Sequence, residues 1–536
     1  MKSPDQRPIS EMGLPLSETK ADIIQEIPMP EEMIEQYESM GMVEQAEDYE
    51  KVIELAKAFD KEGGRTLLVG GSVRDLMMGK TPKDFDIEVR GLEPDVIERI
   101  ARNHGQVEDV GESFSVLKLQ LGPGRDIDIA LPRTDSKTGR GHKGFTVKPD
   151  PYMSTEEAAR RRDFTMNAIA ADPLTGEILD PFNGRQDIRD RIIRVTDAKL
   201  FRDDPLRVMR ALQFMARFNM ELEQESAKVI RSMLPEMNEV SEKRYLDEWR
   251  KMLVQGEKPS LGLAAGMTLG VFREVNPELV ALDKLPQRAD KHPEGDAWIH
   301  TLMVVDESAK IIRREGLSDR DAFIIMLTGV AHDLGKKDTP LTKPDGELKS
   351  IMGHAEKGGE PAIRFLDRIG VNKDDQKIIR KLVENHMVPT YFYAQEKKLG
   401  NRISDGEIRK LAKKLHPATI LQLVMVGEAD KMGRGPFEDP KIPEQLLLPK
   451  MEYPQGKWLL ERARKLGVEA SKPAPVAQGR DWLSIGYTPG KHIGELNRLA
   501  ESLRDDKGFT REKIFQEVYG KSAEEAVMIL TKLSQE

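Results

Sequence analysis

Between residues 201 and 218, apolar side chains recur with the period of an α-helix. Leu206, Met209 and Leu212 are spaced by three residues, and Phe214 follows them closely. Residues three or four apart lie on one face of a helix, and an apolar face is buried against a core. The segment FRDDPLRVMRALQFMARF therefore predicts an amphipathic helix that packs these side chains inward.

Two further segments predict strands nearer the N-terminus. In LLVGGSVRDLMMGKTPKDFDIEV, residues 67–89, Asp84 and Asp86 lie on one apparent strand. Alternate residues of a strand point to the same face, so the two carboxylates project together. The run FTMNAIA, residues 164–170, predicts a buried strand.

The segment VSEKRYLDEWRKML, residues 240–253, predicts another helix. Ser241 is the expected N-cap, and Arg244 and Glu248 have the spacing of an ion pair across one helical turn. We expect this helix to support the preceding one rather than to take part in chemistry.

The composition indicates a cytoplasmic enzyme with several domains. The chain of 536 residues exceeds what one core usually organises, and its 38% hydrophobic content is enough for several cores. It has no cysteine, which excludes disulfides and thiolate ligands. No run approaches about twenty apolar residues, and the start MKSPDQRPISEMG has no hydrophobic signal region, so neither a membrane nor secretion is indicated.

The net charge of -9 does not favour an RNA partner, but the local charge does. Basic residues outnumber acidic ones between residues 185 and 217, and GRGHKGFTVK, residues 139–148, is a second basic stretch. Such stretches can face phosphates while the acidic excess lies elsewhere.

A glycine turn precedes the acidic strand and predicts a phosphate site. Gly70 and Gly71 allow a tight bend that brings amide N–H groups close to phosphate oxygens. A helix expected to open near Ser72 points its positive end at the same phosphates, and Arg74 adds charge. Two neighbouring carboxylates suit a Mg²⁺ ion that carries a triphosphate. Turn and strand together therefore indicate a nucleotide site.

These residues resemble the class II tRNA nucleotidyltransferases, or CCA-adding enzymes, and the related bacterial poly(A) polymerases, over residues 67–253. The resemblance implies an α+β fold: a head with a small mixed sheet, as in the DNA polymerase β superfamily, followed by an all-α neck and body. In RDIDIALPR the family pattern places a third carboxylate at Asp128, with Asp126 on the same face. Asp84, Asp86 and Asp128 are the expected catalytic residues, and such a cluster can hold two metal ions.

The resemblance continues through three more motifs. EEAARRRDFTMNAIAAD, residues 156–172, is similar to the family's second motif, and DPFNGRQDIRDRIIRV, from Asp180, to its third, with Gly184 and Asp187 in place. The fourth motif is the segment FRDDPLRVMRALQFMARF from Phe201. In the family, an acidic residue and an arginine of this motif form a protein template that pairs with CTP or ATP. The nucleotide-binding residues implied by the turn and these motifs are Gly70, Gly71, Ser72, Arg74, Arg161, Arg162, Asp163, Asn167, Asp204, Arg207 and Arg210.

Template residues Asp204 and Arg207 are expected one turn apart on the same helical face. A carboxylate accepts from an exocyclic amine while arginine donates to ring atoms, so C and A can be read and U and G refused. The chain departs from the family at Asp203, where glutamate is usual, and at Gln213, where arginine is usual. The second departure removes a positive charge near the nucleotide.

After about residue 290, a second constellation resembles an HD phosphohydrolase domain, an all-helical fold. The run HPEGDAWIHT is typical of CCA-adding enzymes joined to such a domain. The metal ligands that this resemblance implies are His300, His332, Asp333, His354, His386 and Asp430. Imidazole and carboxylate ligands suit Ni²⁺, Mn²⁺, Co²⁺ or Zn²⁺. His354 and His386 would contact a second metal or the phosphate, and Lys336 the phosphate.

His332 and Asp333, if neighbours on a helix, differ in direction by about 100 degrees, so the metal must lie between helices. A centre of this kind activates water to cleave phosphate esters. The implied activity is that of a phosphatase or a 2′,3′-cyclic phosphodiesterase acting on damaged tRNA ends. The alternative is a metal-bound domain kept as a scaffold with little turnover.

These signals divide the chain into five segments. They are a poorly ordered tail (1–45), a nucleotidyltransferase head (46–200), a helical neck and body (201–290), an HD domain (291–440) and a helical C-terminal tail (441–536). The stretch between Arg133 and Asp150 predicts a mobile loop. The oligomeric state is left open.

The sequence thus predicts a CCA-adding tRNA nucleotidyltransferase that uses Mg²⁺, CTP and ATP without a nucleic-acid template, with a second phosphohydrolase site. Three alternatives share parts of the evidence for it. One is a poly(A) polymerase, the second is a partial enzyme that adds only CC or only A, and the third is an HD phosphohydrolase with a non-catalytic RNA-binding head.

Overall fold

The computed structural model describes residues 27–82, 84–109, 116–137, 145–288, 291–339, 353–434 and 452–535. The chain forms two compact units, residues 1–275 and 276–536.

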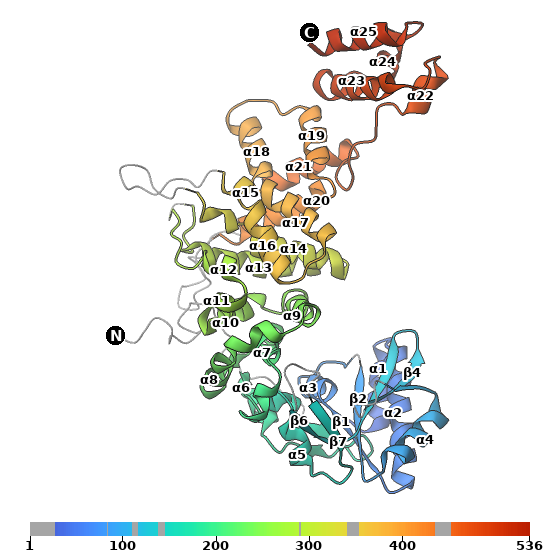
Figure 1. Ribbon diagram of the computed structural model, residues 1–536, viewed down its shortest axis with the longest axis vertical. Helices are drawn as coiled ribbons and strands as arrows, with labels where there is room; N and C mark the ends of the chain where they lie inside the picture. Colours follow the sequence, from blue (N-terminus) through green and yellow to red (C-terminus); the bar gives the residue numbers. More distant parts are fainter. Residues whose placement is uncertain are drawn as a thin grey trace. The chain divides into compact units, whose positions relative to one another are not determined.

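A mixed sheet forms the centre of the first unit (Figure 1). Within the described residues it has seven strands in the order β3-β4-β5-β2-β1-β8-β9. Strands β2 and β5 are parallel, and the other neighbouring pairs are antiparallel. The strands are β1 Arg65–Val69, β2 Phe85–Arg90, β3 Gln106–Asp109, β4 Val116–Gly122, β5 Arg125–Ala130, β8 Ala170–Ala171 and β9 Ile178–Leu179. The predicted small mixed sheet is confirmed.

One face of this sheet is apolar and is covered by helix α2 (Val43–Lys61). Phe85, Ile87 and Val89 alternate along β2 and are almost completely buried, and the ring of Tyr49 from α2 lies 5.3 Å from that of Phe85. Because successive residues point to opposite faces, the polar residues of β2 face away from α2. The sheet is therefore anchored on one side and presents carboxylates on the other.

The predicted poorly ordered tail is wrong for residues 30–39, which form helix α1 (Pro30–Ser39). Met33 and Tyr37 are buried, and the Tyr37 ring lies 6.3 Å from the ring of Phe85. Apolar residues at helical spacing outweigh the proline and charge content that indicated disorder. Residues 1–26 lie outside the described part of the chain.

The remaining elements of the first unit connect the sheet to a helical body. Its other helices are α3 Gly71–Met77, α4 Pro94–His104, α5 Thr155–Arg160, α6 Gly184–Asp190, α7 Arg207–Phe218, α8 Gln224–Ser232, α9 Glu242–Val254, α10 Pro259–Leu269 and α11 Val271–Val275. Short 3₁₀ turns are η3 Thr165–Asn167, η4 Leu200–Asp203 and η5 Leu234–Glu239. Two small ladders pair β6 Arg133–Lys137 with β7 Phe145–Pro149, and β10 Ile192–Ile193 with β11 Glu221–Leu222.

The structure revises two local predictions in this unit. The run predicted as a buried strand is buried, but it forms the η3 turn and only the two-residue strand β8, because Asp163 and Asn167 hydrogen bond to each other and hold the chain in a turn. The predicted loop between Arg133 and Asp150 contains the paired strands β6 and β7. Residues 138–144 within it lie outside the described residues.

Helix α7 confirms the amphipathic helix that was predicted in residues 201–218. Leu206, at its N-cap, and Met209, Leu212 and Phe214 within it are all buried. Helices α9 and α10 pack against α7. Ser241 occupies the N-cap position of α9, as predicted, without a side-chain hydrogen bond to the helix.

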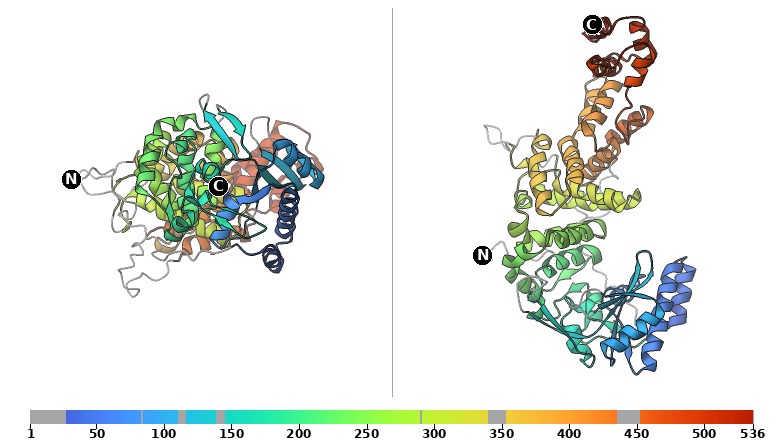
Figure 2. Two further views of the ribbon diagram at one scale, coloured as in Figure 1. Left: turned by 90° about the horizontal axis from the view of Figure 1, so that it is seen from below. Right: turned by 45° about the vertical axis from the view of Figure 1, so that its right-hand side comes forward.

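The second unit is helical throughout its described residues (Figure 2). Its elements are α12 Pro277–Val280, α13 Ala297–Arg314, α14 Asp319–Ala331, η6 Leu334–Lys336, α15 His354–Lys357, α16 Gly359–Arg368, α17 Lys373–Asn385, α18 Val388–Lys398, α19 Asp405–Leu415, α20 Ile420–Met432, α21 Pro454–Lys465, α22 Gly479–Ser484, α23 Lys491–Lys507, α24 Arg511–Val518 and α25 Ala523–Gln535. Helices α22–α25 bury their own apolar cluster around Trp482 and Leu503.

Residues 276–288 were predicted to belong to the neck but pack within the second unit. Glu278 accepts a hydrogen bond from Arg368 Nε at 2.9 Å, and Gln287 accepts one from Lys336. The unit boundary at 275/276 therefore precedes the predicted boundary at 290.

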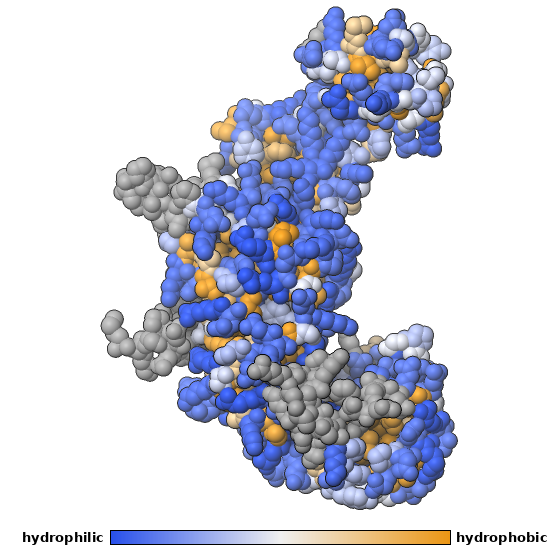
Figure 3. All heavy atoms as spheres, viewed as in Figure 1, coloured by the Kyte–Doolittle hydropathy of each residue, from blue (hydrophilic) through white to orange (hydrophobic). Residues whose placement is uncertain are grey.

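None of the described helices combines the length and the apolar character of a transmembrane span. On the face shown in Figure 3, hydrophilic residues predominate and hydrophobic ones are scattered among them.

Candidate functional sites

Two of the three predicted acidic residues of the head, Asp86 and Asp128, lie on neighbouring strands of the sheet, and Asp84 lies just before β2 rather than on it. Asp86 of β2 and Asp128 of β5 are register partners in the parallel ladder, and Asp84 precedes Asp86 by two residues. Burial raises the pKa of Asp86. Arg162 opposes this shift, whereas the carboxylates of Asp128 and Asp84 reinforce it. A cation placed beside Asp86 would therefore stabilise its ionised form.

These three carboxylates do not enclose a site on their own. In the described parts of the chain, the groups of histidine and acidic ligand atoms lying within 4.8 Å of one another are all in the second unit. Lys118 of β4 lies 2.8 Å from Asp128 Oδ1 and 3.5 Å from Asp126 Oδ2. Lys118 thus neutralises part of the cluster, so a metal at Asp84 and Asp86 would compete with it for Asp128. The role of Asp128 as a third ligand stays a prediction.

The glycine turn reaches the same face. Gly70 has φ +70°, a left-handed conformation that favours glycine, and α3 begins at Gly71 as predicted. A Cβ atom on Gly70 would lie 3.6 Å from Asp86 Oδ2 and 3.5 Å from Arg162 Nη1. Ser72 donates its hydroxyl hydrogen bond to the carbonyl of Val69, at 3.1 Å. Ser72 therefore stabilises the turn itself.

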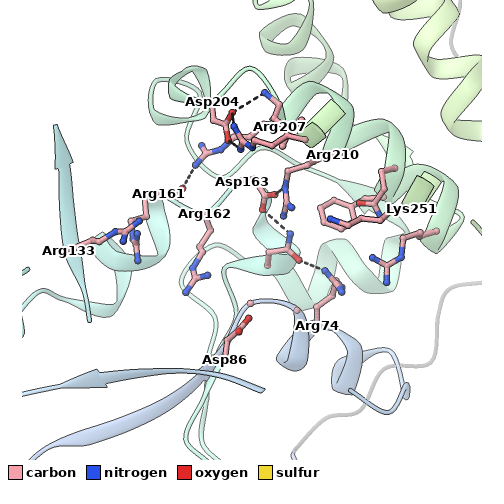
Figure 4. A pocket seen from close by; sticks show the side chains of 18 residues that line it. Arg74, Asp86, Arg133, Arg161, Arg162, Asp163, Asp204, Arg207, Arg210 and Lys251 are labelled. Atoms are coloured by element: carbon pink, nitrogen blue, oxygen red, sulfur yellow. Dashed lines mark hydrogen bonds and ion pairs between the residues drawn. The ribbon is translucent and has the colours of Figure 1, made fainter. Parts of the chain in front are cut away.

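A cavity of about 460 Å³ opens between this turn and helices α7 and α9 (Figure 4). Its carboxylates are Asp86, Asp163 and Asp204. They are outnumbered by the basic side chains Arg74, Arg133, Arg161, Arg162, Arg207, Arg210, Arg217, Arg244 and Lys251. A cavity with this charge balance attracts a polyanion such as a triphosphate. Figure 4 shows Asp86 at one side of it, facing arginines from several other elements.

Most of the predicted nucleotide-binding residues line this cavity. Those that line it are Gly70, Gly71, Arg74, Arg161, Arg162, Asp163, Asn167, Asp204, Arg207 and Arg210. Ser72, Asp84 and Asp128 do not. The sequence did not single out Arg133, Arg217, Arg244 and Lys251 as nucleotide ligands, because only the tertiary fold brings these four together.

A chain of polar contacts fixes the cavity wall. Arg74 donates to Asn167 Oδ1 at 2.8 Å, Asn167 donates to Asp163 Oδ1 at 2.9 Å, and Arg210 donates to Asp163 Oδ2 at 2.6 Å. Burial acts to raise the pKa of Asp163, but Arg210 and Asn167 outweigh it and lower that pKa. Asp163 therefore stays ionised and holds residues from three elements in place.

The predicted template pair, Asp204 and Arg207, does not have the predicted geometry. Helix α7 begins at Arg207, whereas Asp204 lies in extended backbone before it and accepts a hydrogen bond from the amide of Leu206 at 3.1 Å. The two residues therefore do not share a helical face. Arg207 donates to the carbonyls of Leu200 and Arg161, at 2.9 and 2.7 Å, which fixes its guanidinium at the cavity.

Arg244 pairs with Asp204 and not with Glu248, contrary to the predicted pairing along one helix. Its Nη2 atom lies 2.6 Å from Asp204 Oδ2 and its Nη1 atom 3.3 Å from Oδ1. Glu248 pairs with Lys251 instead, at 3.0 Å. Helix α9 thus contributes Arg244 and Lys251 to the cavity, so its role goes beyond support.

The residues of the third motif contact η3 and the start of α6 and do not line the cavity themselves. Asp180 accepts from the amides of Gly184 and Arg185 at the start of α6, at 2.7 and 3.0 Å. Asp187 accepts from the Thr165 hydroxyl at 2.7 Å. A Cβ atom on Gly184 would lie 2.2 Å from the carbonyl oxygen of Thr165. This motif therefore positions η3 and the residues that follow Asp163.

We expect Gly184→Ala to destabilise the head by about 3 kcal/mol, because the new methyl group overlaps backbone that cannot move without disturbing η3. Denaturant unfolding followed by circular dichroism measures this difference. Gly176→Ala, where strain comes only from a positive φ and a contact of 3.2 Å, is a milder comparison. Equal stability of Gly184→Ala and the wild type would contradict the tight contact.

In the second unit, the six predicted histidines and aspartates converge on one buried centre. His300 Nε2 lies 3.1 Å from Asp430 Oδ1 and 3.7 Å from Asp333 Oδ2, and His332 Nε2 lies 3.2 Å from Asp333 Oδ2. His354 Nε2 lies 3.3 Å from Asp333 Oδ1 and 3.1 Å from His386 Nε2. All six residues are at most 7% exposed.

The orientation of the imidazoles fits a metal ion. Nδ1 of His332 lies 2.8 Å from the carbonyl of Gly329, and Nδ1 of His386 lies 2.8 Å from that of Val383. A hydrogen bond to a carbonyl keeps the proton on Nδ1 and leaves the Nε2 lone pair for a ligand. His332 Nε2 is buried beside Asp333 Oδ2, at 3.2 Å, so these two atoms could bind one metal ion. Burial, with His354 and His332, lowers the pKa of His386 to about 3, which keeps it neutral as metal binding requires.

The local geometry differs from the prediction in two details. His332 and Asp333 lie just beyond the end of α14 at Ala331 and not within a helix. Lys336 lies 2.5 Å from Asp333 Oδ2, an ion pair that was not predicted, and its contact with phosphate stays a prediction. Burial acts to raise the pKa of Asp333, but His332 and Lys336 outweigh it and hold that pKa well below its usual range.

The sequence did not identify Glu294 and Arg434, which contact the cluster. Glu294 Oε1 lies 2.8 Å from Nδ1 of both His292 and His300. Arg434 pairs with Asp430 at 2.6 Å. The Pro-Glu pair that follows His292 in HPEGDAWIHT was the available signal for Glu294.

The chain is similar in sequence to known protein families and relatives. Residues 66–194 match the poly A polymerase head domain, and residues 219–282 match a probable RNA and SrmB-binding site of polymerase A. The chain is 33% identical to a multifunctional CCA protein of Stenotrophomonas maltophilia over 437 residues, which cover 80% of this chain and 96% of the relative. It is 32% identical to that of Xanthomonas campestris over 424 residues, covering 77% of this chain and 95% of the relative.

Two solved structures share the fold at low sequence identity. The Bacillus stearothermophilus CCA-adding enzyme in complex with CTP superposes with a TM-score of 0.57 at 19% identity, covering 88% of this chain and 96% of that one. The Thermotoga maritima CCA-adding enzyme complexed with tRNA gives a TM-score of 0.54 at 18% identity, covering 98% and 99% of the two chains.

Proposed function

Since the chain belongs to the family of the multifunctional CCA proteins, we propose that it is a tRNA nucleotidyltransferase that completes or repairs the 3′ CCA end from CTP and ATP. The observation that carries the proposal is the arginine-rich cavity beside Asp86, which offers a triphosphate both counter-charges and a carboxylate for its metal. The cytoplasm, where tRNA is processed, is the proposed compartment.

The arrangement of the head supports nucleotidyl transfer by positioning and charge. Arg74, Arg161 and Arg162 face the space in which a triphosphate would lie, and the Gly70–Gly71 turn offers amides beside it. Asp84 and Asp86 would hold Mg²⁺, which neutralises charge on the triphosphate and lowers the pKa of an attacking hydroxyl when bound. Phosphoryl transfer needs little covalent help from a protein, so these roles suffice.

Base selection is assigned to Asp204 and Arg207. Burial lowers the pKa of Arg207, and its two backbone hydrogen bonds prevent rotation, so the guanidinium presents a fixed donor pattern. Asp204, held by Arg244, presents an acceptor beside it. A rigid donor and acceptor pair can read the edge of a base without a nucleic-acid template.

We expect Arg207→Ala to relax discrimination among nucleotides. Loss of the donor pattern should reduce the preference for CTP and ATP over UTP and GTP, as ratios of kcat/KM, by roughly tenfold or more. Exposed Arg202, in the preceding turn, provides the matched control Arg202→Ala. Unchanged selectivity in Arg207→Ala would remove this residue from the template.

Three tRNA transcripts test the proposed activity: one lacks the whole CCA end, one lacks CA and one lacks only the final A. Incubation with labelled CTP and ATP should extend each one to the same CCA end and then stop. A long ladder of AMP would identify a poly(A) polymerase, and extension of only one kind of transcript would identify a partial CC- or A-adding enzyme. Phosphatase activity without incorporation would favour an HD phosphohydrolase with a non-catalytic head.

We further propose that the cluster around Asp333 is a metal-dependent phosphohydrolase site that acts on phosphate esters at RNA ends, as a phosphatase or 2′,3′-cyclic phosphodiesterase. His300, His332, Asp333 and Asp430 would hold Ni²⁺, Mn²⁺, Co²⁺ or Zn²⁺, which supplies an activated water when bound. Glu294 fixes the ring of His300, and Arg434 fixes Asp430. A metal-bound scaffold without turnover is the alternative, and a phosphatase assay on the purified protein distinguishes the two.

A further inference from the structure

A second cavity, of about 620 Å³, lies within the second unit between helix α19, helix α23 and the start of α24. Helices α19 and α23 touch closely, since a Cβ atom on Gly406 would overlap the carbonyl of Asp505. Lys413 of α19 reinforces this contact through Glu501 and Asp505 of α23, at 2.6 and 3.0 Å. The cavity is therefore part of a packed helical junction.

The carboxylates at this cavity are already neutralised. Asp405 pairs with Arg462 at 2.6 Å, and Asp506 pairs with Lys410. Asp505 is 5% exposed and pairs with Lys413 and with Arg504, the latter at 2.8 Å. Of these four basic partners, only Arg504 lines the cavity. Each of these acidic residues thus has a cationic partner, and Arg511, which also lines the cavity, pairs with Asp481 at 3.0 Å.

Two of the arginines that line the cavity are unpaired among the described residues. Arg402 and Arg409 make no hydrogen bond or ion pair in the described part of the chain. Arg504 donates Nε to Asp505 and Nη1 to the carbonyl of Ala474, but its buried Nη2 has no partner within that part. Because that Nη2 is shielded from solvent, the donors available to a ligand in the cavity are those of Arg402 and Arg409.

We propose that this cavity binds a phosphate group, held by Arg402 and Arg409. Guanidinium groups match phosphate oxygens in geometry and charge. The N-terminus of α24, capped by Thr510, borders the same space and favours an anion. The phosphate belongs to an RNA backbone or to a free phosphate ion. The RNA source rests on the function proposed above, and the phosphate site itself does not.

The full-length double variant Arg402→Gln/Arg409→Gln tests the site, and Arg464→Gln/Lys465→Gln is the matched control. Arg464 and Lys465 of α21 are exposed, do not line the cavity and carry the same total charge. Binding of a tRNA transcript lacking CCA is followed by fluorescence anisotropy over a range of KCl concentrations. Binding of inorganic phosphate is measured by isothermal titration calorimetry, and melting temperatures verify folding.

If RNA supplies the phosphate, the plot of log affinity against log salt becomes less steep by about 0.7 to 0.9 in the cavity variant, the contribution of one neutralised phosphate. Affinity at about 0.1 M salt then falls roughly fivefold, and the control behaves as the wild type. If free phosphate is the ligand, calorimetry shows binding to the wild type and control that the cavity variant loses, with the tRNA slope unchanged.

Identical tRNA slopes and identical phosphate titrations in cavity variant and control would overturn the proposal. Nucleotide addition by the wild type is assayed in parallel. Failure to extend any transcript would contradict the proposed function of the head, yet the phosphate titration would still decide the site at Arg402 and Arg409.

Discussion

Replacing Asp86 by alanine abolishes nucleotide addition, reducing single-turnover extension by roughly a thousandfold or more, while tRNA affinity stays within about twofold of the wild type. Asp86 faces the triphosphate cavity, is aligned with Asp128 on the next strand, and has its pKa raised by burial and by neighbouring carboxylates. Asp86 is the one residue of β2 among the described residues that line the cavity. Asp84→Ala is expected to behave alike, because it shares the face.

Asp126→Ala is the matched control, since Asp126 is exposed on the same face and does not line the cavity. It should retain near-normal extension. Filter binding of tRNA and thermal melting separate lost chemistry from lost binding or folding. Full activity of the Asp86 or the Asp84 variant would refute the metal assignment.

Replacing His332 by alanine removes metal from the second unit and ends phosphohydrolase activity, without affecting CCA addition. The Nδ1 atom of His332 is held by the carbonyl of Gly329, so its Nε2, 3.2 Å from Asp333 Oδ2, is the atom available to a metal. Loss of a ligand should weaken metal binding by at least about a hundredfold, more than loss of an orienting partner does. Metal content by mass spectrometry and hydrolysis of a 2′,3′-cyclic phosphate are the measurements.

His492→Ala, in α23 and outside the cluster, controls for loss of a histidine. Loss of CCA addition together with hydrolysis in His332→Ala would mean that the two activities are coupled. Metal content equal to that of the wild type would contradict the assignment of His332 as a ligand.

The sequence predicted which residues come together at both sites better than it predicted their surroundings. Asp84, Asp86 and the histidine cluster could be identified because each depends on residue type and order along the chain. Arg244 could not be placed, because its pairing with Asp204 depends on how α9 packs against α7. The same applies to Arg217 and Lys251.

Local hydrogen bonds explain the elements that were predicted incorrectly. The run after Asp163 is apolar enough for a strand, but contacts between Asp163 and Asn167 turn it into a 3₁₀ turn. Asp204 was expected within a helix, yet its carboxylate accepts the amide of Leu206 and so precedes the helix start. Polar side chains that bond to nearby backbone compete with regular structure, and periodicity alone does not reveal them.

The most direct test of the head site is a crystal structure with Mn²⁺ and a non-hydrolysable CTP analogue. Anomalous scattering should place Mn²⁺ against the carboxylates of Asp84 and Asp86, with the triphosphate among the arginines of the cavity and the base edge at Asp204 and Arg207. A triphosphate bound elsewhere, or the two carboxylates engaged in ion pairs with no anomalous peak beside them, would contradict the account.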